Sequence, residues 1–179
     1  MIALILLQAA AATGAATGAA TPAWKLADRT NAAGVRSIST SVTGNDGLSR
    51  FVVKCDVGTE SIVSIQFIQP QSLGQGADKP VAVRFDGGPA FTYNWQFPGT
   101  GTYITDPVAI TRLTTFLVKS KTLRVESTNG AGFAVQANFV APASDAMVRQ
   151  VLGVCGYTLG VVPPPPPAPP APPAAEDAQ

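Results

Sequence analysis

The chain has 179 residues, with twelve Lys and Arg against eleven Asp and Glu, and it contains no histidine. The missing histidine excludes Ser-His-Asp catalysis, Cys-His catalysis and histidine-based zinc sites. The charges are well mixed and form no basic run, which argues against a nucleic-acid partner.

The N-terminal residues resemble an export signal. An apolar run from Ile2 to Leu7 precedes a stretch of Ala, Thr and Gly, which is the order found in a secretory signal peptide. No Lys or Arg precedes the run, so a disordered tail is the alternative for residues 1–23. The run is well short of the ~20 apolar residues that span a bilayer, so we expect no stable membrane span. The signal predicts a periplasmic or extracellular protein.

Residues 24–160 read as one β-rich domain. Residues 35–42 are a weaker strand candidate, and the "GNDG" turn joins them to a clearer strand over 48–57. That strand alternates, which predicts a half-buried position in a sheet. Its inward face carries Phe51, Val53, Cys55 and Val57, and its outward face carries Arg50, Lys54 and Asp56. Another strand is predicted over 61–68.

The middle of the domain contains further strands. Residues 69–80 are rich in Pro and Gly and are expected to form an exposed loop. Residues 81–87 then point Val81, Val83 and Phe85 inward and Arg84 and Asp86 outward, and residues 92–97 place Tyr93, Trp95 and Phe97 on one side. Strands over 123–127 and 133–139 flank Asn129-Gly130, a strong hairpin signal.

Two segments have helical periodicity. In residues 105–120, Asp106 is the expected N-cap and Pro107 suits the first helical position. In residues 142–156, Ser144 is the expected N-cap, Asp145 lies in the first turn, and Gly156 ends the helix. The apolar face of this second helix includes Cys155 near its middle.

The two cysteines are expected to form a disulfide. Cys55 points inward from a strand, and Cys155 lies on the apolar face of a helix, so both meet where that helix packs on the sheet. Two cysteines behind an export-like segment are typical of one disulfide. Two unrelated buried thiols are the alternative.

The candidate sites are weaker. Lys54 and Asp56, Arg84 and Asp86, and Arg124 and Glu126 each repeat a basic-x-acidic pattern, which favours a solvated sheet face with cross-strand charge pairs. The alternative is a polar and aromatic recognition patch made of Arg84, Asp86, Tyr93 and Trp95. The loops "GQGAD" and "GTGTY" read as turns. We predict no catalytic residues, no metal site and no cofactor.

The C-terminal residues 161–179 are proline-rich and are expected to be a disordered or polyproline II tail. Such a tail is either a spacer or a ligand for an aromatic groove on a partner.

The order of patterns from about Arg50 to Gly156 resembles the VasI family of type VI secretion-associated envelope proteins. The resemblance rests on a strand containing Cys, "GTESIVSIQF", "VAVRFDGGPAFTYNW", "TRLTTFLVKSKTLRVES", "FAVQANF" and a final amphipathic helix with Cys. The last units also resemble the invasion-associated locus B family. The resemblance implies an exported β-rich domain without known catalytic residues.

The sequence therefore predicts an α+β fold, mostly antiparallel sheet, with two helices and the C-terminal helix tied to a strand by a disulfide. We expect a non-enzymatic envelope protein that binds another envelope or secretion-system protein, with the tail as one candidate contact. The alternative is a soluble small-ligand or inhibitor-like binding domain that uses the exposed sheet face. An enzyme is the third and weakest interpretation.

Overall fold

The computed structural model describes residues 23–165, so the predicted export signal and most of the proline-rich tail lie outside the described residues. Nine strands and two helices form this part of the chain. In chain order they are β1 (Lys25–Thr30), β2 (Arg36–Thr43), β3 (Arg50–Val57), β4 (Ser61–Ile68), β5 (Gln75–Phe85), β6 (Ala90–Pro98), β7 (Gly101–Ile104), α1 (Pro107–Leu117), β8 (Thr122–Thr128), β9 (Ala134–Val140) and α2 (Ala146–Val154).

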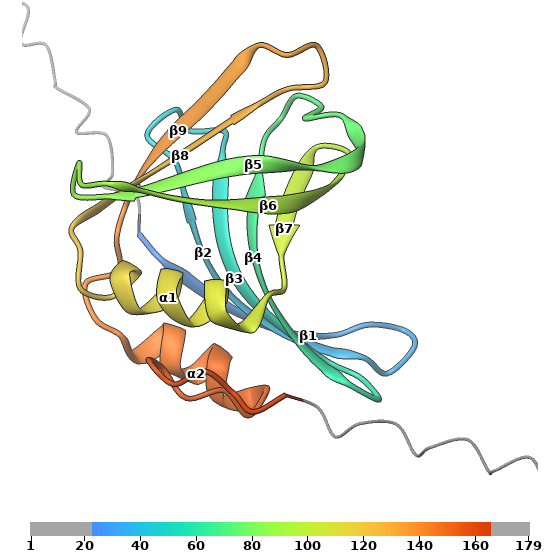
Figure 1. The fold of residues 1–179 in the computed structure, drawn as a ribbon. Coiled ribbons are helices and arrows are strands. Elements are labelled where there is room, and N and C mark those ends of the chain that lie inside the picture. Colours follow the sequence, from blue (N-terminus) through green and yellow to red (C-terminus); the bar gives the residue numbers. More distant parts are fainter. Residues whose placement is uncertain (1–22, 166–179) are drawn as a thin grey trace, which may run out of the picture.

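All neighbouring strands are antiparallel, in the order β1-β2-β3-β4-β7-β6-β5-β8-β9. The sheet curls so that β5, β6, β8 and β9 lie across the face of β2, β3 and β4 (Figure 1). Its two ends approach each other. In the turn after β2, the Asn45 amide donates to the Asn138 carbonyl of β9 at 2.9 Å. The indole of Trp24 likewise donates to the Val140 carbonyl at 2.8 Å. The predicted α+β fold with a mostly antiparallel sheet is confirmed.

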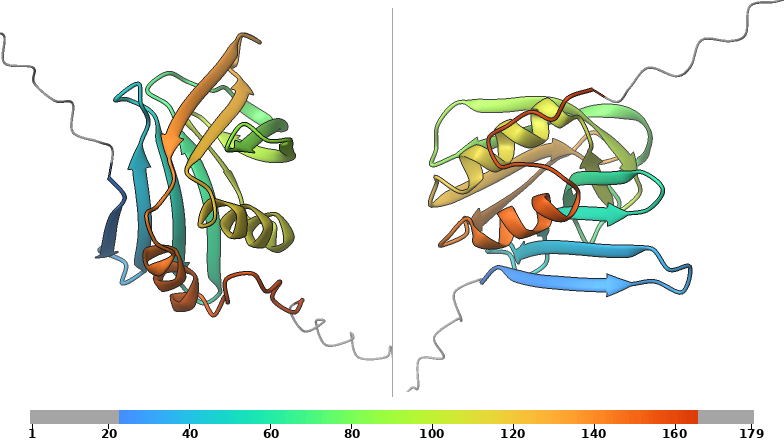
Figure 2. Two further views of the ribbon diagram at one scale, coloured as in Figure 1. Left: turned by 90° about the vertical axis from the view of Figure 1, so that its left-hand side faces the viewer. Right: turned by 90° about the horizontal axis from the view of Figure 1, so that it is seen from below.

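A single core fills the curled sheet, and both helices cover one end of it (Figure 2). The inward faces of β3 and β4 supply Phe51, Val53, Ile65 and Phe67, as the alternation predicts, and β6 adds the fully buried Trp95. Each helix closes the end with three large apolar side chains: Ile110, Leu113 and Leu117 from α1, and Val148, Val151 and Leu152 from α2. Burying one such side chain stabilises the fold by about 1.5–3 kcal/mol.

The start of α1 follows the prediction, and the start of α2 does not. The Asp106 carboxylate accepts the Ala109 amide at 2.7 Å, and Pro107 takes the first helical position. For α2 the Ser144 N-cap prediction is wrong, because the cap position belongs to Asp145 and the helix begins at Ala146. Asp145 has a helical backbone and makes no side-chain cap bond. Its carboxylate instead pairs with the Arg149 guanidinium, one turn later, at 2.6 Å.

The predicted disulfide joins Cys55 to Cys155 across 100 residues of sequence, with the two Cα atoms 5.9 Å apart. Cys55 is fully buried on the inward face of β3. Cys155 is at the C-cap of α2, not near the middle of its apolar face as predicted, because the helix ends one residue earlier. The bond therefore fixes the end of α2 to the sheet.

Three strand segments differ from the prediction. The edge strand β1 was not predicted, and "GTGTY", expected to be a turn, contains the first three residues of β7. The expected exposed loop over 69–80 is partly strand, since β5 begins at Gln75, and its Leu73 is only 1% exposed because it packs into the core. β1 is a short strand at the edge of the sheet, and glycine and proline in the other two segments are typical of loops, so none of the three carries a clear strand signal.

Candidate functional site

Asp86, one of the four predicted patch residues, holds a turn together. It is the only non-glycine residue with a positive φ, 49°, within residues 23–165. Its carboxylate accepts the backbone amides of Thr122 and Lys121 at 2.8 and 2.9 Å. These amide hydrogen bonds hold the pKa of Asp86 below its usual value. Asp86 thus ties the β5–β6 turn to the start of β8.

The aromatic patch residues lie on the inward face of the sheet. Tyr93 pairs with Val81 and is half-buried, while Trp95 is fully buried and shares its face with Phe97. The Tyr93 hydroxyl and the Trp95 indole N–H are buried with no hydrogen-bond partner among the described residues. Arg84 points the opposite way, so the structure does not bring Arg84 and Trp95 onto one surface.

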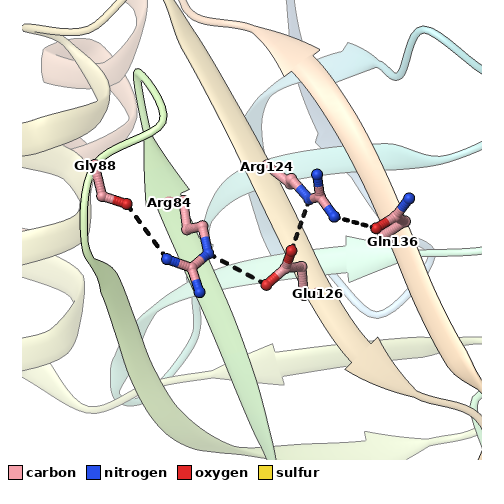
Figure 3. A network of polar contacts seen from close by, with 5 residues as sticks. All are labelled: Arg84, Gly88, Arg124, Glu126 and Gln136. Atoms are coloured by element: carbon pink, nitrogen blue, oxygen red, sulfur yellow. Dashed lines mark hydrogen bonds and ion pairs between the residues drawn. The ribbon is translucent and has the colours of Figure 1, made fainter.

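Arg84 belongs to a polar network on the outward face of β5, β8 and β9 (Figure 3). Its guanidinium contacts Glu126 of β8 at 3.3 Å and donates to the Gly88 carbonyl at 3.4 Å. Glu126 also pairs with Arg124 at 2.7 Å, and Arg124 donates to Gln136 of β9. One carboxylate thus serves two guanidiniums. Among the six residues of the basic-x-acidic pattern, Arg84 and Glu126 pair across two strands, whereas the pairs Lys54–Asp56 and Arg124–Glu126 each lie within one strand.

A second polar surface covers the outward face of β1–β3. The register places Lys25, Ala27 and Arg29 of β1 beside Ser41, Ser39 and Ser37 of β2, which in turn lie beside Val52, Lys54 and Asp56 of β3. All of these residues except Val52 line a hollow of about 680 Å³ that also includes Arg50. We call this hollow the β2 trough: its floor is the serine row of β2, and its walls are β1 and β3.

The cations of the β2 trough are staggered. In the register, Arg50, Lys25, Lys54 and Arg29 follow one another at steps of two residues, alternating between β3 and β1. Two residues of a strand span about 7 Å. Lys54 pairs with Asp56 at 2.9 Å, whereas within the described residues Lys25, Arg29 and Arg50 have no carboxylate within 4 Å. Arg50 instead donates to the Ser41 hydroxyl at 3.3 Å.

A second hollow of about 570 Å³ adjoins the trough and shares Asp56 with it. Its lining is aromatic and amide-rich, with Tyr103 and Tyr157 beside Gln66 and Gln96. The disulfide helps to place Tyr157, because the chain turns at Gly156, with φ of 76°, directly after Cys155. Burial, and then the nearby charge of Asp106, raise the pKa of Tyr157, so its hydroxyl stays neutral at physiological pH.

Two outward-facing residues of this surface are covered by their neighbours. Val52 is 4% exposed and Ser64 5% exposed, although neither belongs to the core inside the sheet. Residues facing solvent on a flat sheet keep much more of their surface accessible. The Ser64 hydroxyl accepts a hydrogen bond from the Gln66 amide at 3.0 Å. Neighbouring side chains therefore rise above a buried floor.

The sequence analysis missed most of this surface. Lys25 and Arg29 lie on β1, which has only six residues, too few for a clear alternation of apolar and polar side chains. The outward serines of β2 were visible as every second residue of "SISTS", but only their pairing with both neighbours shows that they form a floor.

Comparisons with protein-family models, curated proteins and solved structures find no match for this chain. Within residues 23–165, no group of three or more His, Cys, Asp or Glu side chains is placed to hold a metal ion. No helix in the same range is long and apolar enough to cross a membrane.

Proposed function

We propose that this chain is a non-enzymatic, exported module that binds another component of the cell envelope through the outward face of β1–β4. The observation that carries the proposal is the pair of adjoining hollows on this face, with three cations that lack carboxylate partners among the described residues. Cations of a structural network are normally paired, as Arg84 and Arg124 are on the opposite layer. Unpaired cations around a hollow favour an external ligand.

Two further features support export and a non-catalytic role. The Cys55–Cys155 disulfide is typical of proteins that fold in oxidising compartments such as the periplasm. With both cysteines bonded and no histidine in the chain, a free thiolate nucleophile and an imidazole general base are missing. The resemblance to the VasI family favours a partner that belongs to a secretion system. The proline-rich tail is a second candidate contact for that partner.

A second candidate function is the binding of a small ligand in the hollow beside Tyr157. Its two tyrosines and two glutamines offer flat aromatic faces and paired donors and acceptors, which is the combination that small polar ligands need. Because this hollow shares Asp56 with the β2 trough, the two candidates use one continuous surface.

Site-specific photo-crosslinking in intact cells tests the proposal. A photoreactive residue replaces Ser39 on the floor of the trough, and a matched one replaces Gln136 on the outward face of β9. We expect an adduct at position 39 that is absent or much weaker at position 136. Equal labelling at both positions, or none at 39, would contradict a binding role for this face.

A further inference from the structure

We propose that the β2 trough binds a linear acidic polysaccharide whose carboxylates face Lys25, Arg29 and Arg50. This inference rests on the proposed function, because it names the ligand of the same face. Four kinds of observation support it: the charge of the trough, the stagger of its cations, the chemistry of its floor and its shape.

The net positive charge of the trough favours an anionic ligand. Four cations and one acid line it, and that acid, Asp56, is already paired with Lys54. The remaining three cations lie on both walls, so an anion entering the trough meets positive charge from either side. Desolvation inside a hollow strengthens such attraction relative to a flat surface.

The stagger of the cations favours a long linear ligand over a single compact anion. Because β2 lies between β1 and β3 (Figure 1), the alternation of Arg50, Lys25, Lys54 and Arg29 places successive charges on opposite sides of the serine row. A single compact anion could reach only one or two of them. A linear chain lying along β2, with acidic groups on both sides, can reach Arg50, Lys25 and Arg29, while Lys54 stays paired with Asp56.

The serine row on the floor of the trough favours a ligand with hydroxyl groups over an extended peptide. The register pairs β2 with a strand on each side, so its ladder is occupied and the floor offers only side chains to a ligand. An extended peptide over β2 would leave its own amides without backbone partners, which is costly in a hollow. The hydroxyls of Ser37, Ser39 and Ser41 both donate and accept, and therefore match the ring hydroxyls of a sugar.

The shape of the trough argues against a membrane surface. A bilayer surface cannot follow a hollow of about 680 Å³ down to a serine floor. Leu26 also lines the hollow and is 38% exposed, and it is the only exposed large apolar side chain of β1, so the cations have a single aliphatic residue beside them rather than a cluster of anchors. Exposed apolar anchors are what peripheral membrane proteins normally add to their charges.

The test measures binding of short oligogalacturonates to the purified domain, with the methyl-esterified oligomer as an uncharged control. We expect the acid form to bind and the ester to bind at least tenfold more weakly. Raising the salt from about 50 to about 300 mM should weaken binding of the acid form, because exposed charges are screened. Equal binding of acid and ester would overturn the proposal.

Matched double variants locate the site. K25S/R29S removes two cations of the trough, and K119S/K121S removes two exposed cations of the loop between α1 and β8. Surface charge pairs contribute up to about 1 kcal/mol each, so K25S/R29S should weaken binding by about fivefold or more. K119S/K121S should weaken it less than twofold. Equal losses would mean that binding follows net charge alone, which would overturn the site.

The results also separate this inference from the proposed function. A polyglutamate peptide that binds as tightly as the oligogalacturonate, or a position-39 adduct that is a protein, would overturn the polysaccharide while leaving the binding face in place. An adduct at position 39 without any oligogalacturonate binding would do the same. Failure of the crosslink and of every soluble probe would remove both.

Discussion

Removing the disulfide should cost a large part of the stability of this domain. The bond joins residues 100 apart, and in the chain-entropy model a loop of that length contributes about 4.7 kcal/mol by restricting the unfolded chain. Measured losses are more often 2–4 kcal/mol. A domain of about 140 residues has an unfolding entropy near 0.3 kcal/mol per kelvin, so a loss of ~3 kcal/mol lowers the melting temperature by about 10 °C.

The assay compares urea unfolding of the oxidised protein, the reduced protein and the C55A/C155A variant. Reduced and variant proteins should lose similar free energies of unfolding, and reductant should leave the variant unchanged. The double variant is needed because Cys55 is fully buried, so a single change would leave an unpaired thiol in the core. A loss below 1 kcal/mol in both would refute the reasoning and show that packing of α2 alone holds the end of the sheet.

Three further changes probe other parts of the fold. Y93F should leave the free energy of unfolding unchanged or raise it, because the buried hydroxyl has no partner among the described residues; a loss above ~1 kcal/mol would reveal an unseen one. R84A should cost under about 1 kcal/mol in denaturant melts, because the side chain is 41% exposed; a loss of several kcal/mol would mean a rigid network. The pKa of Asp86 is lower in the folded protein than its ordinary value of 3.8, so its carboxylate stabilises the fold above that pH and ceases to do so as the pH falls through the folded pKa. D86N should therefore be less stable than the parent at neutral pH, and the difference should shrink below pH 3.8; a pH-independent difference would contradict this account.

The long alternating strands and the disulfide could be predicted from the sequence because their signals are local. Phe51, Val53 and Cys55 alternate with polar residues, and that period alone sets which face is buried. Asp106 and Pro107 likewise mark the start of α1 wherever the helix packs. The short strands β1 and β7 gave no such signal, since four to six residues pair only because a neighbouring strand is already in place.

The predicted patch failed to assemble for a geometric reason. Arg84 and Trp95 are close in sequence, yet Arg84 occupies an outward position of β5 while Trp95 occupies an inward position of β6. Alternation therefore separates them by the thickness of the sheet. Asp86 lies after the end of β5, where its carboxylate accepts the amides of Lys121 and Thr122.

The two outward faces of the curled sheet differ in how their charges are satisfied, and this contrast carries the functional argument. On β5, β8 and β9, each guanidinium of the network already has a carboxylate and a carbonyl or amide oxygen as partners. A ligand there would have to displace internal partners and would gain little. On β1–β3, Lys25 and Arg29 have no carboxylate within 4 Å among the described residues, and serines of β2 line the hollow beside them. A ligand that contacts Lys25 and Arg29 displaces no internal carboxylate from them, and this asymmetry is why we assign the ligand to the β2 trough.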